Sequence, residues 1–125
     1  MKLSHATITI MTTTNTFDYQ KQLDAALSSL QEHGERPRLL LHACCVPCSS
    51  YVLEYLADYF DITEFYYNPN IYPVEEYRRR LNELREFLPR FPPAQKASVT
   101  LVEEAYEPET FEAVSKVTIK YFYSD

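Results

Sequence analysis

One stretch of the chain, residues 38–50, constrains its fold more than any other and reads R-L-L-L-H-A-C-C-V-P-C-S-S. The apolar start is typical of a buried strand in a parallel sheet, and Pro47 stands where a helix would begin. A strand that leads through a short turn into a helix places that turn at the carboxyl end of the sheet. Open α/β folds bind their ligands there. We therefore expect a functional site at this turn.

The turn carries three cysteines, Cys44, Cys45 and Cys48. Cys45 and Cys48 are three residues apart, so both side chains can face one point above the first helical turn. The free N–H groups and the positive dipole end of a helix favour thiolate over thiol. These two cysteines alone would suit the dithiol of a thioredoxin-like protein. The additional Cys44 favours a metal cluster, which takes several thiolates, over a dithiol or over cysteines that merely fill a core.

The composition limits the chain to one domain and disfavours several classes of protein. A chain of 125 residues buries one modest core. The net charge of −6 does not indicate nucleic-acid binding, although a local basic patch would still permit it. No run approaches the length of a transmembrane helix, and the first residues lack the apolar centre of a signal peptide. We expect a cytoplasmic protein with no membrane partner, in which clustered thiols stay reduced.

Hydrophobic periodicity predicts an alternation of helices and strands. Residues 1–16 are expected to form a flexible tail, and residues 17–33 an amphipathic helix that ends at Gly34. The expected strands are residues 38–43, 62–67, 99–103 and, at an edge of the sheet, 117–123. The helices that follow the first three strands are expected to begin at Pro47, Pro73 and Pro108, the second being stopped by Pro89, Pro92 and Pro93. This order implies parallel strands with right-handed crossovers.

Two polar residues near the cysteines have both a structural and a functional interpretation. His42 lies in the first strand, where a backbone partner commonly satisfies a histidine, or where it would donate a proton to a substrate. Asn68 and Asn70 flank a proline and are turn formers. Asn68 also follows the second strand, beside the cysteine turn, where it would contact a ribose or a base. We take His42 and Asn68 as candidate catalytic residues.

A run of three arginines, Arg78, Arg79 and Arg80, would bind phosphates as part of a basic ridge. Glu75 and Glu76 precede Arg79 and Arg80 by four residues each, so ion pairs on a solvated helix face are the favoured interpretation. Only an arginine that escapes such pairing is expected to touch RNA. Three tyrosines would either pack against helices or stack on a base: Tyr66, Tyr67 and Tyr72.

Two motifs of the chain resemble the epoxyqueuosine reductase QueH family. They read L-L-L-H-A-C-C-V-P-C-S-S-Y-V-L-E-Y-L and D-I-T-E-F-Y-Y-N-P-N-I-Y-P-V-E-E-Y-R-R-R-L. The likeness spans residues 17–114. It implies an α/β fold of three layers around a parallel sheet, like that of the PP-loop and adenine nucleotide α-hydrolase proteins, which is a Rossmann-like fold.

The same resemblance implies an activity, a cofactor and partners. Members of this family reduce epoxyqueuosine in tRNA to queuosine, the last step of queuosine biosynthesis. A 4Fe–4S cluster is implied, with Cys44 and Cys45 matching the paired ligands of the family motif and Cys48 its third cysteine. The implied partners are tRNA carrying epoxyqueuosine and an electron donor that the sequence does not identify.

The chain departs from the family pattern after residue 114. Family members continue into a second Cys-x-x-Cys, whereas S-K-V-T-I-K-Y-F-Y-S-D does not resemble them, and Gly34 is the one glycine present. We therefore expect residues 17–125 to form a partial reductase domain of a truncated protein. The alternatives are an inactive remnant that binds tRNA or a partner, and a thioredoxin-like dithiol exchanger.

Overall fold

The computed structural model describes the backbone of residues 17–123 and the side chains of residues 17–116. The chain divides into two units, Met1–Glu35 and Arg36–Asp125. In the first unit, α2 spans Tyr19–Glu32 and begins where the Asp18 side chain accepts a hydrogen bond from the Lys21 N–H at 3.2 Å. Gly34 follows with a φ of +65°, a left-handed conformation that suits glycine at a helix end. The predicted first helix is confirmed, and the predicted tail lies outside the described residues.

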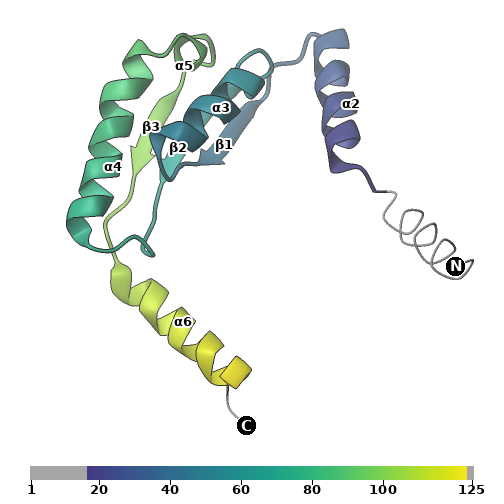
Figure 1. The fold of residues 1–125 in the computed structure, drawn as a ribbon. Coiled ribbons are helices and arrows are strands. Elements are labelled where there is room, and N and C mark those ends of the chain that lie inside the picture. The colour runs from purple at the N-terminus through teal and green to yellow at the C-terminus, as the bar shows by residue number, and fades with distance from the viewer. Residues whose placement is uncertain (1–16, 124–125) are drawn as a thin grey trace, which may run out of the picture. The chain divides into compact units, whose positions relative to one another are not determined.

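The second unit is built on a parallel sheet of three strands in the order β1-β2-β3 (Figure 1). The strands are β1 (Arg38–His42), β2 (Asp61–Tyr66) and β3 (Thr100–Glu103). The helices are α3 (Val46–Leu56), α4 (Val74–Phe87), the 3₁₀ helix η1 (Leu88–Arg90), α5 (Pro92–Lys96) and α6 (Pro108–Tyr123). The α/β class, the parallel sheet and the first three predicted strands are confirmed, and the architecture is Rossmann-like.

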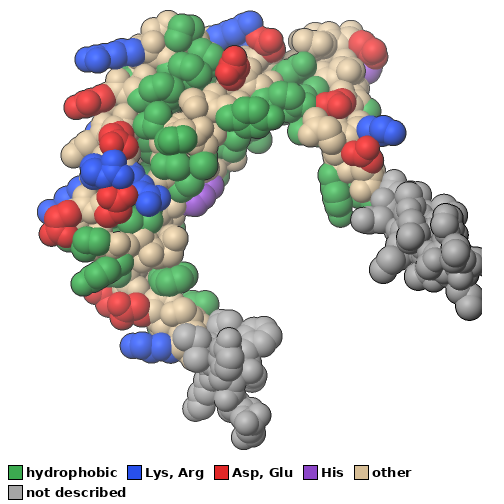
Figure 2. Space-filling view, in the orientation of Figure 1, with side chains coloured by type: hydrophobic (Ala, Val, Ile, Leu, Met, Phe, Trp, Pro, Cys, Tyr) green, Lys and Arg blue, Asp and Glu red, His purple; other side chains and the backbone are tan. Residues whose placement is uncertain are grey.

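Helices α3, α4 and α5 pack on one face of this sheet (Figure 1). Leu53 of α3 and Ala57, just after that helix, pack on Ile62 of β2, while Leu81 and Leu84 of α4 join the cluster around Tyr66. Apolar side chains gather between α3 and α4, and basic and acidic side chains intermix over α4 (Figure 2). Because side chains alternate along a strand, every second residue of β1, β2 and β3 faces the other side of the sheet. Two of them, Leu40 and Val102, are exposed.

One guanidinium ties the amino end of the sheet to the ends of two helices. Arg36 lies just before β1, and its Nε donates to Asp61 Oδ1 at 2.8 Å. Its other two nitrogens donate to the carbonyl oxygens of Ala57, Asp58 and Lys96 at 3.0, 3.2 and 2.8 Å. Carbonyls at helix ends have no partner within the helix, so this one side chain satisfies groups that both α3 and α5 leave open.

One prediction about the later part of the chain is wrong. Residues 117–123 form the end of α6 rather than an edge strand. An edge strand needs a neighbour for its backbone groups, whereas a continued helix satisfies them internally. The prediction that prolines stop the preceding helix is confirmed, because α4 ends at Phe87, but short helical turns follow at once: Pro89 lies in η1, and Pro92 begins α5. Proline suits the first turn of a helix because its missing N–H has no partner there in any case.

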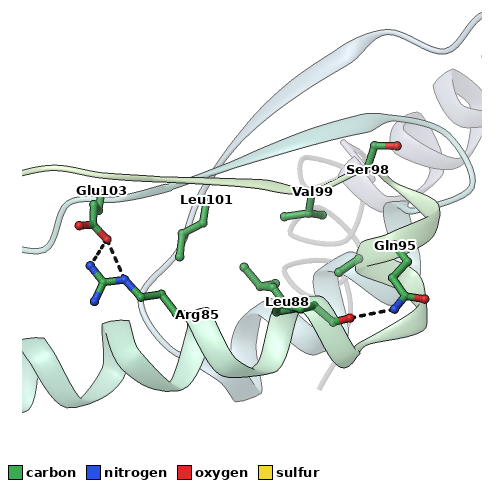
Figure 3. A pocket seen from close by; sticks show the side chains of 9 residues that line it. Arg85, Leu88, Gln95, Ser98, Val99, Leu101 and Glu103 are labelled. Atoms are coloured by element: carbon green, nitrogen blue, oxygen red, sulfur yellow. Dashed lines mark hydrogen bonds and ion pairs between the residues drawn. The ribbon is translucent and has the colours of Figure 1, made fainter.

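A hollow of about 440 Å³ lies between β3 and the helices α4, η1 and α5 (Figure 3). Its middle is apolar, with Leu88, Val99 and Leu101 facing one another. At one end Arg85 pairs with Glu103. No cysteine lines this hollow, so it is separate from the predicted site. Within residues 17–123, no helix combines the length and apolar character that a membrane crossing requires.

Candidate metal centre

The three cysteines of the turn converge at the carboxyl end of β1. Their Sγ atoms all lie within 4.8 Å of one another, and those of Cys44 and Cys45 are 3.7 Å apart. All three are free thiols; Cys44 and Cys45 are partly buried and Cys48 is exposed. The predicted convergence of Cys45 and Cys48 is therefore found, and Cys44 joins them.

The residue before the cysteines is fixed from two directions. The Ala43 N–H donates to Phe65 O at 2.9 Å, which continues the pairing of β1 with β2. Asn68 Nδ2 donates to Ala43 O at 2.8 Å, and the Asn68 side chain is buried. With both of its backbone groups bonded, Ala43 holds Cys44 in place. Asn68 thus supports the cysteine turn from the end of β2.

The backbone at Cys45 sets the electrostatics of the thiols. Cys45 is the last extended residue before α3, and its carbonyl accepts the Ser49 N–H at 3.2 Å. The backbone N–H of Cys48 bonds the Cys45 sulfur and lowers the pKa of that thiol. Burial raises the pKa of Cys44 to about 11, and its neighbour Cys45 adds to the rise. The lowered pKa of Cys45 agrees with the preference for thiolate expected at a helix start, whereas desolvation dominates at Cys44.

His42 is exposed at the end of β1, next to the turn. Its Nε2 lies 2.9 Å from Tyr67 O, and because a carbonyl only accepts, Nε2 carries the proton of this hydrogen bond. The structural interpretation of a strand histidine with a backbone partner is confirmed. The other nitrogen, Nδ1, is not used in this bond.

A buried acidic residue of β2, Glu64, was not identified from the sequence as part of the site. Glu64 has an exposed fraction of 0%, and neither of its carboxylate oxygens has a hydrogen-bond partner among the described residues. Burial raises the pKa of Glu64, and the neighbouring Ser49 hydroxyl opposes part of that rise. Ile62, Glu64 and Tyr66 alternate with less buried residues in β2. That period of two was the signal that would have placed the acid in the core.

The arginine run is largely paired, as predicted. Arg80 Nε donates to Glu76 Oε1 at 2.7 Å. Arg79 does not take the predicted partner; it pairs with Glu76 at 2.7 Å and with Glu83. These arginines lower the pKa of Glu76 to about 2. Of the three arginines, only Arg78 shows no ion pair within the described part of the chain.

The three candidate tyrosines differ in burial. Tyr66 is fully buried and its hydroxyl donates to Tyr77 O at 2.8 Å, so packing accounts for it. Tyr67 is half-buried, with its ring 6.2 Å from that of Phe65. Tyr72 is exposed. Base stacking is therefore sterically open at Tyr72 and closed at Tyr66.

Comparison with known proteins identifies the family. A sequence model described as "Epoxyqueuosine reductase QueH" matches residues 39–121, a segment that contains all three cysteines and both candidate catalytic residues. The chain belongs to the epoxyqueuosine reductase QueH family. Epoxyqueuosine reductase QueH of Staphylococcus epidermidis is 43% identical over 99 residues, which is 79% of this chain and 42% of that protein. The Staphylococcus aureus protein of the same name is 39% identical over 94 residues, 75% of this chain and 39% of that protein.

The chain therefore spans about two fifths of the length of these QueH relatives. The Streptococcus pyogenes relative gives a similar picture, with 34% identity over 75% of this chain and 37% of that protein. No solved structure matches the chain. The resemblance read from the two motifs is confirmed at the level of the family, but the matched segment continues to residue 121, beyond residue 114, where the likeness was expected to end.

The donor set of this QueH chain fits a metal centre. Ligands of one tetrahedral ion with metal–sulfur bonds of about 2.3 Å lie about 4 Å apart, which is close to the spacing seen here. Each thiolate of a 4Fe–4S cluster binds a different iron, so the three sulfurs would spread farther apart to hold a cluster. Cys48 is exposed at the start of a helix, where side-chain rotation permits such spreading. The three thiols supply three ligands, and a fourth position is open to another group.

Proposed function

We propose that this chain is part of a reductase that converts epoxyqueuosine in tRNA to queuosine, with an iron–sulfur centre held by Cys44, Cys45 and Cys48. One observation carries the proposal: three free thiols converge at the carboxyl end of a parallel sheet, within the segment that matches the QueH family. Reduction is the chemistry that the names of these relatives state. The all-parallel order of the described strands supports this reading over a thioredoxin-like dithiol, whose sheet would include antiparallel strands.

The cysteines prepare the site to bind metal in a graded way. Cys45 has the lowered pKa and is the readiest thiolate ligand, whereas Cys44 must lose a proton that burial helps it to keep. Metal binding therefore releases protons and becomes tighter as pH rises. A bound 4Fe–4S cluster would supply electrons for the reduction. The remaining ligand would come from a group beyond the described residues.

We propose that His42 donates a proton to the substrate and that Asn68 holds the cysteine turn in place. Removal of an epoxide oxygen as water consumes two electrons and two protons, so a proton donor is needed beside the cysteines. His42 lies two residues before Cys44, and the bond from its Nε2 to Tyr67 O orients the ring. Asn68 acts through Ala43, because its amide is bonded there and buried. In this assignment His42 is a catalytic residue and Asn68 a positioning residue.

The proposed partners follow from the same activity. The substrate is tRNA that carries epoxyqueuosine, and a reductant of the cell recharges the iron–sulfur centre. We place the reaction in the cytoplasm, because three closely spaced free thiols need a reducing compartment. Arg78 is exposed and, within the described residues, has no ion pair, so it is the arginine of the run that remains for RNA phosphates.

Anaerobic reconstitution of the chain with iron and sulfide tests the proposal. We expect bound iron and sulfide, with visible absorbance, in the unsubstituted chain. Cys45→Ser should lose most of both, since the readiest thiolate is removed. Tyr51→Phe is the matched control: Tyr51 lies on α3 near the cysteines and is exposed, so its variant should bind as before. An iron-free, colourless product in which Cys44→Ala changes nothing would contradict the proposal.

A further inference from the structure

The two flanks of α4 face different parts of the molecule. On one flank Glu83 and Phe87 line a groove of about 480 Å³ together with Val46 and Pro47, the residues between Cys45 and Cys48. On the other flank Asn82 lines a hollow with Arg78, Arg85 and Tyr106 on the side away from the cysteine turn. The start of α3 therefore lies against the first flank.

Arg80 belongs to the flank that faces the cysteines. With 3.6 residues per turn, Arg80 lies one turn before Glu83 and two turns before Phe87 on the same side of the helix. It is also nearer than they are to the amino end of α4, which lies at the carboxyl end of the sheet. Val46 packs against the core cluster that contains Tyr77, Leu81 and Leu84 of α4, so the chain just after Cys45 touches this helix. Arg80 is thus placed at the level of Cys45.

The electrostatic contacts of Arg80 agree with this placement. Arg80 and Cys45 interact electrostatically, although the Cys48 N–H is the main cause of the lowered pKa of Cys45 and Glu76 is the main cause of the raised pKa of Arg80. The hydrogen bond to Glu76 at 2.7 Å fixes the guanidinium, and the side chain is only 33% exposed. Arg79, one residue earlier, shares Glu76 but is 56% exposed and also pairs with Glu83. Of the two arginines on Glu76, Arg80 is the less exposed and is the one that interacts electrostatically with Cys45.

We propose that Arg80, held by Glu76 on the side of α4 that faces the start of α3, is the cation of the cysteine site and offsets the negative charge of its thiolates. Three thiolates bound to a divalent ion carry a net negative charge, which a fixed guanidinium nearby stabilises. The positive charge of Arg80 also attracts anionic reagents to the free thiols. The effect on bound metal rests on the proposed function, whereas the effect on the free thiols does not.

Paired alkylation reagents test the charge without metal. Iodoacetate is anionic and iodoacetamide neutral, and the same thiolate attacks the methylene carbon of either reagent and displaces iodide. The rate with iodoacetate divided by the rate with iodoacetamide at Cys45 does not depend on the fraction of thiolate, and it reports the local charge. The rates are measured on the full metal-free chain at low salt, with each cysteine resolved by peptide mass spectrometry. We expect Arg80→Gln to lower the ratio about two- to fivefold, and the change to fade in high salt.

Two further variants separate charge from packing. Arg80→Lys keeps the charge and should retain most of the ratio. Arg79→Gln removes an equal charge from the same pair of helical turns and should leave the ratio at Cys45 unchanged. A ratio that Arg80→Gln does not alter would overturn the proposal. It would also fall if Arg80→Lys lowered the ratio as far as Arg80→Gln does, since packing and not charge would then be responsible.

Cobalt binding extends the test to the metal-bound site. Thiolate-to-cobalt charge-transfer absorbance follows Co²⁺ binding to the full chain, and Arg80→Gln should weaken it roughly three- to tenfold relative to the unsubstituted chain and to Arg79→Gln. Equal affinities in all three would overturn the role of Arg80 toward bound metal. Absence of any cobalt binding in the unsubstituted chain would overturn the proposed metal centre instead, and the alkylation ratio would still decide the role of Arg80 toward the thiols.

Discussion

The two ends of the parallel sheet are bonded in opposite ways. At the amino end, the Arg36 guanidinium donates to one carboxylate and three backbone carbonyls, all of which lie in or next to β2, α3 and α5. At the carboxyl end, three thiols remain free, and the Glu64 carboxylate has no partner within the described residues. The same short strands therefore connect an end whose polar groups are hydrogen-bonded to an end where some polar groups have no partner within the described residues.

This difference separates the groups that hold the fold from the groups that are available to a ligand. Buried polar groups are normally satisfied, so those left open within a folded chain deserve a functional explanation. The bonds at the amino end join α3, α5 and β2 through one side chain. At the carboxyl end, Asn68 donates to Ala43 O and the Ala43 N–H donates to Phe65 O, and these two bonds hold the backbone of the turn without involving its sulfurs. We expect loss of Arg36 at the first end to lower stability, and substitutions of the three cysteines at the second end to change binding.

The largest effect on stability is expected for Arg36→Ala. The variant leaves the carbonyls of Ala57, Asp58 and Lys96 without their donor and should lower the free energy of unfolding by about 2–3 kcal/mol. Urea denaturation followed by circular dichroism measures the change. Arg36→Lys keeps the charge but not the planar fork, so it should recover less than half of the loss.

Arg38→Ala is the control for this variant, because Arg38 is an exposed arginine two residues later at the start of β1. It should change stability by less than about 0.5 kcal/mol. Metal binding by the folded fraction should be the same in all three variants, since none of them touches the turn. A large loss of cobalt binding in Arg36→Ala at temperatures where the chain is still folded would remove the distinction between the two ends.

The strand–turn–helix at the cysteines was predictable because several local rules agree there. Leu39 to Leu41 are apolar, Pro47 suits a helix start, and the spacing of Cys45 and Cys48 matches one helical turn. The parallel order followed from the alternation of strands and helices. The family could be read from the two motifs because they cover the site itself.

Other features depended on tertiary contacts that local patterns do not contain. Residues 117–123 alternate like a strand, yet their backbone continues α6. The sequence pairs Arg79 and Arg80 equally well with acids, and only the packing of α4 against α3 distinguishes the arginine beside Cys45. Glu64 looks like an ordinary charged residue until the burial of Ile62 and Tyr66 assigns its face.

A smaller effect, and an opposite sign, is expected for Glu64→Leu. Removal of a buried carboxyl without a partner should raise the free energy of unfolding by about 1–2 kcal/mol at neutral pH. The raised pKa means that the folded chain holds this proton more tightly than the unfolded chain does. The stability that the group contributes is therefore full below its unfolded pKa and is lost as pH rises through the folded pKa.

Urea denaturation across pH 4 to 8 checks this assignment, with roughly 4.3 as the unfolded pKa of a glutamate. The unsubstituted chain should lose stability relative to Glu64→Leu as pH rises, and the gap should be smallest in acid. Ser49→Ala removes the hydroxyl next to the carboxyl. In the Ser49→Ala background, the gain in free energy of unfolding produced by Glu64→Leu at neutral pH should be larger, since that hydroxyl opposes the rise in the pKa of Glu64. A Glu64→Leu variant less stable than the parent at every pH would show that the carboxyl has a stabilising partner and that the carboxyl end of the sheet does not leave this polar group without one.

The smallest effect is expected for Arg85→Gln, which repeats the loss of an arginine in a different setting. Arg85 pairs with Glu103 at one end of the hollow in Figure 3, and the two side chains are 47% and 45% exposed. Solvent and salt screen such a pair, so the variant should change the free energy of unfolding by less than about 0.5 kcal/mol, and by less still in high salt. Arg36 differs because most of its partners are backbone carbonyls at helix ends, which have no second donor within their helices. If urea denaturation gave Arg85→Gln a loss as large as that of Arg36→Ala, charge rather than carbonyl satisfaction would account for the stability of the amino end.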